Sequence, residues 1–257
     1  MHILITNDDG VTAPGLFALQ QALAPLGQTT VIAPARNYSA AGHRKTMHKP
    51  LRLEPAALAD GSPAWACSGA PSDSVALALL GFVKEPIDLV VSGINPNANI
   101  GQDLTYSGTV TAAMEAVIAG VPGVAISVDG AHALADFAAA AQAAAAVTQR
   151  IAAQGLPAGL LLNVNVPAGP VQGWRVTRQG RRRYRDALVE RQDPRGKPYY
   201  WIGGEAPSGE AIPGTDFWAL AHGYISVTPL QLDLTAHAAL PALTAWWPAE
   251  ADSPPPA

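Results

Sequence analysis

Two acidic side chains, Asp8 and Asp9, stand next to each other directly after the apolar run at residues 3–5. Adjacent side chains of a continuing strand point to opposite faces of a sheet, so the pair could not share a ligand unless the chain turns. Asn7 and Gly10 favour such a turn, because both tolerate backbone conformations that other residues avoid. A single Asp here would be read as a helix cap, but two neighbouring carboxylates favour a cation between them.

Strands and helices that could position this pair alternate along the first two thirds of the chain. Helices are predicted at about 14–26, 72–82, 109–119 and 134–153, and strands at 29–33, 87–91, 124–128 and 160–166. The alternation predicts an α/β fold, a doubly wound, Rossmann-like α/β/α sandwich. Ligands of such parallel sheets bind at the carboxyl ends of the strands, where Asp8 and Asp9 are expected to lie.

The character of the sequence changes after Pro167. The stretches RVTRQGRRRYRD, YYWIGG and YISVTPLQLDL are typical of β-ribbons or extended arms. We therefore predict a catalytic domain at 1–167 and a smaller C-terminal β-rich arm module at 168–247, packed onto the sandwich or onto another subunit. A short helix ends at Trp246 and Trp247, which we expect to be buried. The tail at 248–257 is rich in Pro, Ala and acidic residues, so it is expected to be disordered.

Composition narrows the classes of function. Of the 257 residues, 49% are hydrophobic, and the formal net charge of −4 gives no support for binding a nucleic acid duplex. A single cysteine, Cys67, indicates a reducing environment, and the N-terminus shows neither a signal peptide nor an apolar membrane segment. These features predict a cytoplasmic protein that does not bind a membrane.

Three further polar segments fall at loop positions that the predicted topology brings towards Asp8 and Asp9. They are PARNYSAAGHRK (34–45) with Ser39, SGINPNANIGQD (92–103) with Asn95 and Asn99, and the helix start YSGTV (106–110) with Ser107, Gly108 and Thr109. Each residue alone could be an ordinary turn or cap residue, but a helix start is also a natural anion site. Together they would form a set of oxygen ligands beside an anion cradle.

These motifs occur in a fixed order from NDDG (7–10) through GAPSDSV, QDPRG and GTDFWAL to YISVTPLQLDLT. In this the chain resembles the SurE-type survival proteins, a family of metal-dependent 5'-nucleotidases. The resemblance implies one divalent cation per subunit bound by Asp8, Asp9, Ser39 and Asn95, with phosphate contacts from Asn95, Asn99, Ser107, Gly108 and Thr109. It also implies a homodimer or homotetramer with exchanged C-terminal arms. The chain departs from the family pattern at Asn97, where many members have Gly, and at Ala70, where members commonly have Thr.

The implied ligand set contains oxygen donors without His or Cys, which favours Mg²⁺ or Mn²⁺ over Zn²⁺. The expected reaction is that of an acid-phosphatase-like phosphoric monoester hydrolase, which releases nucleoside and phosphate from nucleoside 5'-monophosphates. Asp8 and Asp9 are the predicted catalytic residues. One of them would orient or deprotonate the attacking water, or Asp8 would itself attack phosphorus and form an aspartyl phosphate. Nucleoside 3'-monophosphates and polyphosphate could be further substrates.

Other functions remain open at this point. The alternative is a non-catalytic sensor that binds nucleotide and metal on the same fold. A dinucleotide-dependent enzyme is disfavoured because the first loop lacks G-x-G-x-x-G, and a haloacid-dehalogenase-like phosphatase would have alternating rather than adjacent acids.

Two basic segments of the sequence each allow more than one interpretation of their role. Residues 43–45 (His-Arg-Lys) either lie in an exposed polar loop or reach phosphate. The stretch from Arg175 to Arg195 contains eight arginines, which form a solvated face, a subunit contact or an attractive surface for long anions such as polyphosphate. Arg181, Arg182 and Arg183 are the residues in which the last interpretation would be tested.

Overall fold

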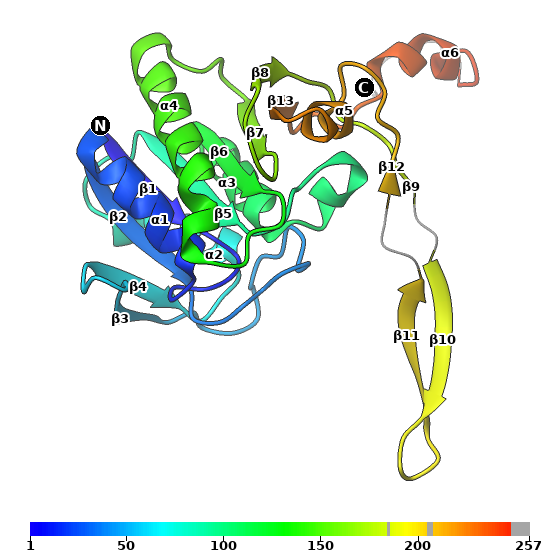
Figure 1. The fold of residues 1–257 in the computed structure, drawn as a ribbon, viewed down its shortest axis with the longest axis horizontal. Coiled ribbons are helices and arrows are strands. Elements are labelled where there is room, and N and C mark those ends of the chain that lie inside the picture. Colours follow the sequence, from blue (N-terminus) through cyan, green and yellow to red (C-terminus); the bar gives the residue numbers. More distant parts are fainter. Residues whose placement is uncertain (184–185, 205–207, 248–257) are drawn as a thin grey trace, which may run out of the picture.

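The computed structural model describes residues 1–183, 186–204 and 208–247. Its centre is a nine-stranded sheet with the order β3-β4-β2-β1-β5-β6-β7-β13-β8, covered by helices on both faces (Figure 1). The predicted α/β/α sandwich is therefore confirmed. The tail at 248–257, for which disorder is predicted, lies outside the described residues.

The middle of the sheet is parallel. It contains β1 (His2–Thr6), β2 (Gln28–Pro34), β4 (Pro63–Cys67), β5 (Leu89–Asn95), β6 (Gly123–Val128) and β7 (Leu160–Val166). The outer strands are β3 (Leu53–Ala57), antiparallel to β4, and β13 (Tyr224–Gln231), antiparallel to β7 and parallel to β8 (Gly173–Val176). Strand pairing thus extends the sheet beyond residue 167, and the domain boundary at this point stays a prediction.

Two helices cover each face of the sheet. Helices α1 (Pro14–Leu23) and α4 (Ala138–Gln154) lie on one face, and α2 (Pro71–Leu77) and α3 (Gly108–Ile118) on the other (Figure 1). Ile3 and Ile5 pack in the core cluster that contains the leucines of α1, whereas Leu4 packs in the cluster that contains Val75 of α2 and Ala112 of α3. The first strand is apolar without interruption because both of its faces are buried.

Helices α1, α2 and α4 are shorter than the sequence predicts, because short turns of other helix types form part of the predicted ranges. A 3-10 turn at Ala24–Leu26 follows α1, a π-helical turn at Ala78–Phe82 follows α2, and a 3-10 turn at Leu134–Phe137 precedes α4. A further 3-10 turn, Gly101–Thr105, leads into α3. No helix among the described residues is both long enough and apolar enough to span a membrane.

Strand β1 lies between β2 and β5, so the chain first builds the sheet on one side of β1 and then continues on the other. In open α/β sheets, this change of direction leaves a crevice at the carboxyl ends of the two central strands. Asp8 and Asp9 follow β1, and Asn95 is the last residue of β5. The topology therefore brings these three side chains to the same crevice.

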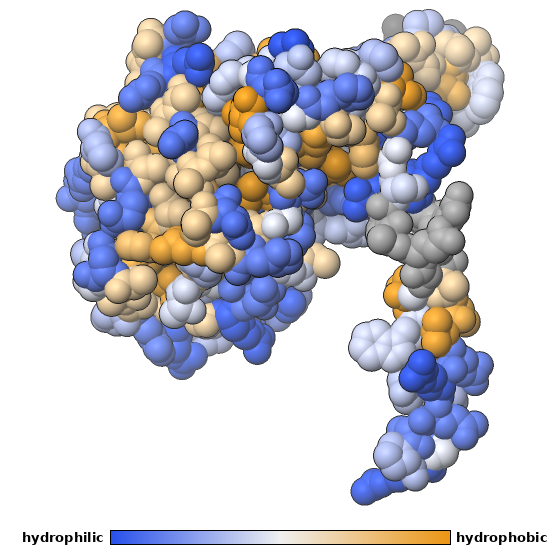
Figure 2. Space-filling view, in the orientation of Figure 1, coloured by the Kyte–Doolittle hydropathy of each residue, from blue (hydrophilic) through white to orange (hydrophobic). Residues whose placement is uncertain are grey.

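The C-terminal part contains a β-hairpin that projects away from the sandwich, formed by β10 (Asp186–Gln192) and β11 (Pro198–Gly204) (Figure 1). The short strands β9 (Arg182–Arg183) and β12 (Ser208–Gly209) pair at its base. Leu188 is 72% exposed and Ile202 is 86% exposed, and Figure 2 shows hydrophobic side chains near the base of the hairpin and hydrophilic ones at its tip.

Two short helices follow the hairpin, α5 (Asp216–Ala221) and α6 (Leu240–Thr244), the latter after a 3-10 turn at His237–Ala239. The prediction that Trp246 and Trp247 are buried is wrong, since each is 70% exposed. The reason is that the preceding helix α6 contains no buried residue, so this end of the chain does not pack against the core.

Candidate active site

The turn after β1 is closed by the side chain of Asn7. Its Oδ1 accepts a hydrogen bond from the amide of Gly10 (3.1 Å), and its Nδ2 donates to the Gly10 carbonyl (3.0 Å). Gly10 has a φ of 110°, a conformation that side chains with a Cβ rarely adopt. The turn ends the strand and holds Asp8, which is 3% exposed, and the half-buried Asp9 at the edge of the sheet.

Asp8 packs directly against the start of α3. The hydroxyl of Thr109 donates to Oδ1 of Asp8 (2.7 Å), and Thr109 itself is fully buried. A Cβ at Gly108 would lie 2.7 Å from Cβ and 2.9 Å from Oδ2 of Asp8, so glycine is needed for this close approach. Gly108 and Thr109, which are predicted to meet phosphate, thus contact a carboxylate of the protein.

Burial makes both carboxylates costly to ionise. It raises the pKa of Asp8, while the hydroxyl of Thr109 and nearby backbone amides of Thr109 and Gly108 partly lower it again. Burial raises the pKa of Asp9 to about 6, with a further contribution from the neighbouring charge of Asp8. A divalent cation between the two side chains would relieve both effects.

The loop after β2 lies against the same pair. The amide of Tyr38 donates to the carbonyl of Asp8 (2.7 Å), and Asn37 accepts from the amide of Ser39 (2.7 Å). The Nδ2 of Asn37 lies 3.4 Å from Oδ1 of Asp9. These contacts place Ser39 beside the two carboxylates.

Asn95 reaches the site through an irregular strand end, because the pairing of β5 with β6 shifts register between Ser92 and Asn95. Its Nδ2 donates to the carbonyl of Asn97 (2.5 Å), which leaves Oδ1 as the atom of this side chain that could bind a cation. Two hydrogen bonds fix the position of Asn99. Its Nδ2 donates to the hydroxyl of Ser127 (2.8 Å), and its backbone amide donates to Oδ1 of Asn165 (2.7 Å).

One cavity of about 400 Å³ collects most of these residues. Of the predicted site residues, its lining contains Asp8, Asp9, Ser39, Asn95, Asn99 and Ser107. Gly108 and Thr109 lie behind Asp8 rather than in the lining, and the hydroxyl of Ser107 caps α3 by accepting from the amide of Val110 (3.1 Å). The cavity is also lined by Asp103 and Tyr106, which sequence reasoning did not single out, and by Arg182, which it considered only as part of a basic surface for long anions.

The donor set fits a hard cation. In the described part of the chain, no group of three or more His, Cys, Asp or Glu side chains is placed to hold a metal ion. A cation in this cavity would therefore need neutral oxygens in addition to the two carboxylates. Ser39 and Asn95 supply such oxygens in the same lining.

Residues 43–45 are exposed and lie in a loop, as one of the two sequence alternatives has it, and two of them also anchor this loop to α3. His43 Nε2 lies 3.0 Å and Lys45 Nζ 2.8 Å from the carboxylate of Glu115, a residue of α3 that is 5% exposed. Hydrogen bonding from His43 is the main reason that the pKa of Glu115 lies below its usual value. An acidic residue in a helix that is otherwise uncharged was the sequence signal for this contact, which anchors the loop that carries Ser39.

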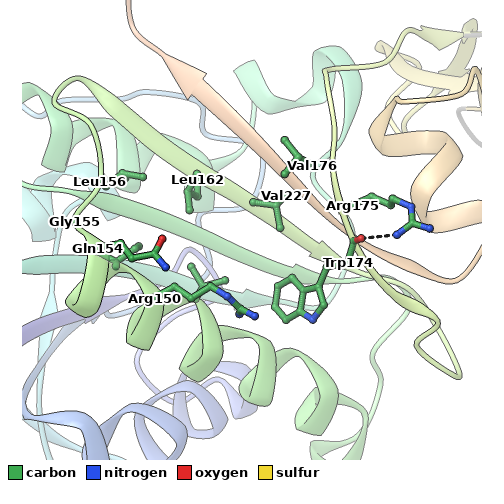
Figure 3. A pocket seen from close by; sticks show the side chains of 11 residues that line it. Arg150, Gln154, Gly155, Leu156, Leu162, Trp174, Arg175, Val176 and Val227 are labelled. Atoms are coloured by element: carbon green, nitrogen blue, oxygen red, sulfur yellow. Dashed lines mark hydrogen bonds between the residues drawn. The ribbon is translucent and has the colours of Figure 1, made fainter.

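A second cavity of about 400 Å³ lies between α4 and strands β7, β8 and β13 (Figure 3). Apolar side chains such as Leu162 and Val227 form much of its lining. Arg150 lies over the ring of Trp174, with Cζ 5.3 Å from the ring centroid. None of the predicted site residues is in this lining, so the carboxylate-bearing cavity remains the candidate active site.

Comparisons with known proteins identify the family of the chain. A family model described as "Survival protein SurE" matches residues 3–186. The 5'-nucleotidase SurE of Chloroflexus aggregans is 51% identical over 96% of this chain and 99% of that protein. The 5'-nucleotidase SurE of Herpetosiphon aurantiacus is 52% identical over 91% of this chain and 94% of that protein.

The fold has a solved counterpart. The crystal structure of the SurE protein from Aquifex aeolicus superposes with a TM-score of 0.80 at 36% identity, covering 96% of this chain and 99% of that one. The similarity therefore includes the C-terminal segment as well as the sandwich. The chain belongs to the SurE family of survival proteins.

Proposed function

We propose that this chain is a metal-dependent 5'-nucleotidase, a hydrolase that converts nucleoside 5'-monophosphates into nucleoside and phosphate. The observation that carries the proposal is the convergence of Asp8 and Asp9 with Ser39 and Asn95 in one cavity beside the start of α3. Relatives named 5'-nucleotidase SurE, about half identical over nearly the whole chain, support the same activity.

The residues that would hold the metal are Asp8, Asp9, Ser39 and Asn95, with one ion per subunit. Their oxygen donors favour Mg²⁺ or Mn²⁺. When bound, such an ion supplies positive charge that offsets the phosphate and helps to activate water. Asn95, Asn99 and Ser107 line the remaining part of the cavity and are proposed to contact the phosphate oxygens.

Asp8 and Asp9 have different surroundings, and we propose that they have different roles in the reaction. Asp8 is buried, and its Oδ1 already accepts a hydrogen bond from Thr109 (2.7 Å). This bond lowers the nucleophilicity of that oxygen and favours an orienting role over direct attack on phosphorus. Asp9 is less buried, and the Nδ2 of Asn37 lies 3.4 Å from its Oδ1, so this carboxylate is freer to accept a proton from the attacking water.

Direct attack by Asp8 is the competing route, and it can be tested by trapping. Acid quenching during turnover of a ³²P-labelled monophosphate should leave the wild-type chain unlabelled if water attacks phosphorus directly. A phosphoryl group recovered on Asp8 would replace the water route with an aspartyl phosphate.

Phosphate release from a panel of nucleoside 5'-monophosphates tests the proposal as a whole. We expect release with Mg²⁺ or Mn²⁺ and its loss with a chelator. Nucleoside 3'-monophosphates and polyphosphate belong in the same panel as further proposed substrates. Binding of nucleotide and metal without phosphate release would instead support the non-catalytic sensor.

The proposed assembly is a homodimer or homotetramer with exchanged C-terminal arms, in the cytoplasm. The exposed hydrophobic residues of the β10–β11 hairpin, including Leu188, Trp201 and Ile202, support an intermolecular role for this arm. Light scattering of the full chain, compared with a triple substitution of these residues by Ser, tests it. A wild-type chain that is monomeric at micromolar concentration would contradict the proposal.

A further inference from the structure

Arg182 lies in the lining of the candidate active site although it is distant in sequence from the other site residues. Among the described residues that line this cavity, it alone carries a positive charge. Its neighbour Arg183 instead pairs with Glu210 and is exposed. Adjacent arginines of the same basic segment therefore have different environments.

The backbone around Arg182 is tied to the loop that precedes α3. The amide of Arg182 donates to Oε1 of Gln102 (2.6 Å), and Nε2 of Gln179 donates to the carbonyl of Gly101 (2.7 Å). The fully buried Asp216 accepts from the amides of Gly101 (2.9 Å) and Gly180 (2.8 Å). This network fixes the position of Arg182 relative to the cavity.

The side chain of Arg182 is supported by the ring of Phe217. A Cβ at Gly101 would lie 2.8 Å from this ring, one at Gly180 2.6 Å and one at Gly209 2.0 Å, so three glycines leave the space that the ring fills. The guanidinium carbon lies 5.6 Å from the ring centroid. An arginine held in this way has less freedom to lose when it binds a ligand.

Nε of Arg182 lies 2.8 Å from Oδ2 of Asp103, an ion pair in which the Nε–H makes no hydrogen bond within the described part of the chain. Arginine has five N–H donors, and this contact involves the one on Nε. The terminal nitrogens can donate in the two-bonded geometry that suits a phosphate group. The Arg182 side chain is 18% exposed, so such bonds would form largely away from water.

The charges of the cavity explain why a second cation is needed. A divalent ion would offset Asp8 and Asp9, but the double negative charge of a phosphomonoester would then have no partner of its own. Arg182 adds a positive charge to the same cavity, and its loss would remove an attraction for the phosphate. Asp103 helps to orient the arginine through the contact at Nε.

From this geometry we infer that Arg182 binds the phosphate group of the substrate in the cavity that Asp8 and Asp9 also line. The inference rests on the proposed phosphomonoesterase function and adds a binding residue to it. Arg182 comes from the segment that leads into the β10–β11 hairpin. Substrate binding therefore depends on this C-terminal segment as well as on the sandwich.

Titration of the full chain with inorganic phosphate, at saturating Mg²⁺, tests the inference without requiring turnover. Arg182→Ala should weaken phosphate binding and raise KM for a nucleoside 5'-monophosphate by roughly 10- to 100-fold, the loss expected for charge-assisted hydrogen bonds. Arg182→Lys, which keeps the charge but not the fork, should fall between this variant and the wild type. The matched control Arg183→Ala should bind phosphate as the wild type does.

The affinity for Mg²⁺ separates phosphate binding from a structural role. It should stay within about twofold of the wild type in Arg182→Ala if the cation ligands are undisturbed, whereas disruption of the cavity would weaken Mg²⁺ and phosphate together. If Arg182→Ala does not fold, Arg182→Lys decides, with a loss of phosphate affinity of at least about threefold expected.

Two results would separate a failure of the inference about Arg182 from a failure of the proposed hydrolase function. Equal phosphate affinity and equal KM in Arg182→Ala and the wild type would overturn the inference and leave the proposed hydrolase in place. Arginine-dependent phosphate binding by a wild-type chain that releases no phosphate from monophosphates would overturn the proposed hydrolase and leave the phosphate site in place.

Discussion

The two walls of the cavity are built in different ways. On one wall, Asp8 follows a central strand and is held by Thr109 at the start of α3, so it is part of the packed core. On the other wall, Arg182 is placed by hydrogen bonds to the loop before α3, and Tyr106 of that wall is 61% exposed. Core packing fixes the first wall, whereas polar contacts between distant segments fix the second. We therefore expect substitutions on the first wall to affect turnover and stability, and substitutions on the second to affect mainly substrate binding.

Removing one carboxylate of the first wall should have the largest effect. Asp8→Asn or Asp9→Asn should lower kcat more than about 100-fold, because each keeps the shape of the side chain and removes a charge used for metal binding and proton transfer. The measurement is phosphate release, with far-UV circular dichroism as the control for folding. A folded variant of either residue with wild-type kcat would remove that residue from the proposed machinery.

Thr109 tests whether the start of α3 acts through Asp8. Thr109→Val keeps the shape of the side chain but removes the hydroxyl that donates to Asp8, so it should lower kcat about tenfold and the free energy of unfolding by about 1–3 kcal/mol. Thr109→Ser keeps a hydroxyl and should recover most of the activity. If Thr109→Ser lost as much activity as Thr109→Val, the hydrogen bond would not account for the loss by itself, and the two walls would differ less than we propose.

The pH dependence of stability tests whether the carboxylates of the first wall are desolvated. In the metal-free protein, Asp9 binds its proton more tightly when folded (pKa about 6) than when unfolded (3.8). Its contribution to stability is therefore fully present below about pH 4 and is lost as pH rises through about 6. Desolvation raises the pKa of Asp8 as well, so its contribution has the same sign.

Thermal unfolding of the wild type and Asp9→Asn from pH 4 to 7.5 measures this contribution. The variant should gain stability relative to the metal-free wild type as pH rises, and saturating Mg²⁺ should remove that gain. Parallel curves at all pH values would mean that Asp9 is not in the low-dielectric environment of the first wall.

The first wall could be predicted from the sequence to a large extent. Asp8 and Asp9 follow β1 and Asn95 ends β5, and both strands have clear apolar patterns. The order of the strands brings these ends together. The start of α3 was also predicted, but a helix start does not indicate which anion it faces. Here the hydroxyl of Thr109 contacts Asp8.

The second wall could not be predicted in the same way. Arg182 stands between two other arginines, and no local pattern separates it from them. Its place is set by Gln102 and by the contacts that Asp216 makes with Gly101 and Gly180, across long separations in the sequence. Tertiary hydrogen bonds of this kind have no period along the chain. The sequence did not indicate strands β3 and β4 either. They contain Pro55 and Pro63, and proline within a run argues against a strand.

The smallest effect is expected at Glu115, which links the first wall to the loop that carries Ser39. Glu115→Gln weakens the ion pairs with His43 and Lys45, but Lys45 is 49% exposed, so the loss of unfolding free energy should stay near 1 kcal/mol or less. The loop would be held less firmly, and Mg²⁺ affinity should fall about two- to fivefold with KM for substrate following it. Glu210→Gln, which removes the exposed partner of Arg183, is the matched control and should leave Mg²⁺ affinity unchanged. A loss of stability in Glu115→Gln without any change in Mg²⁺ affinity would show that the Ser39 loop is positioned independently of α3, because the anchor would then support the fold and not the cation site.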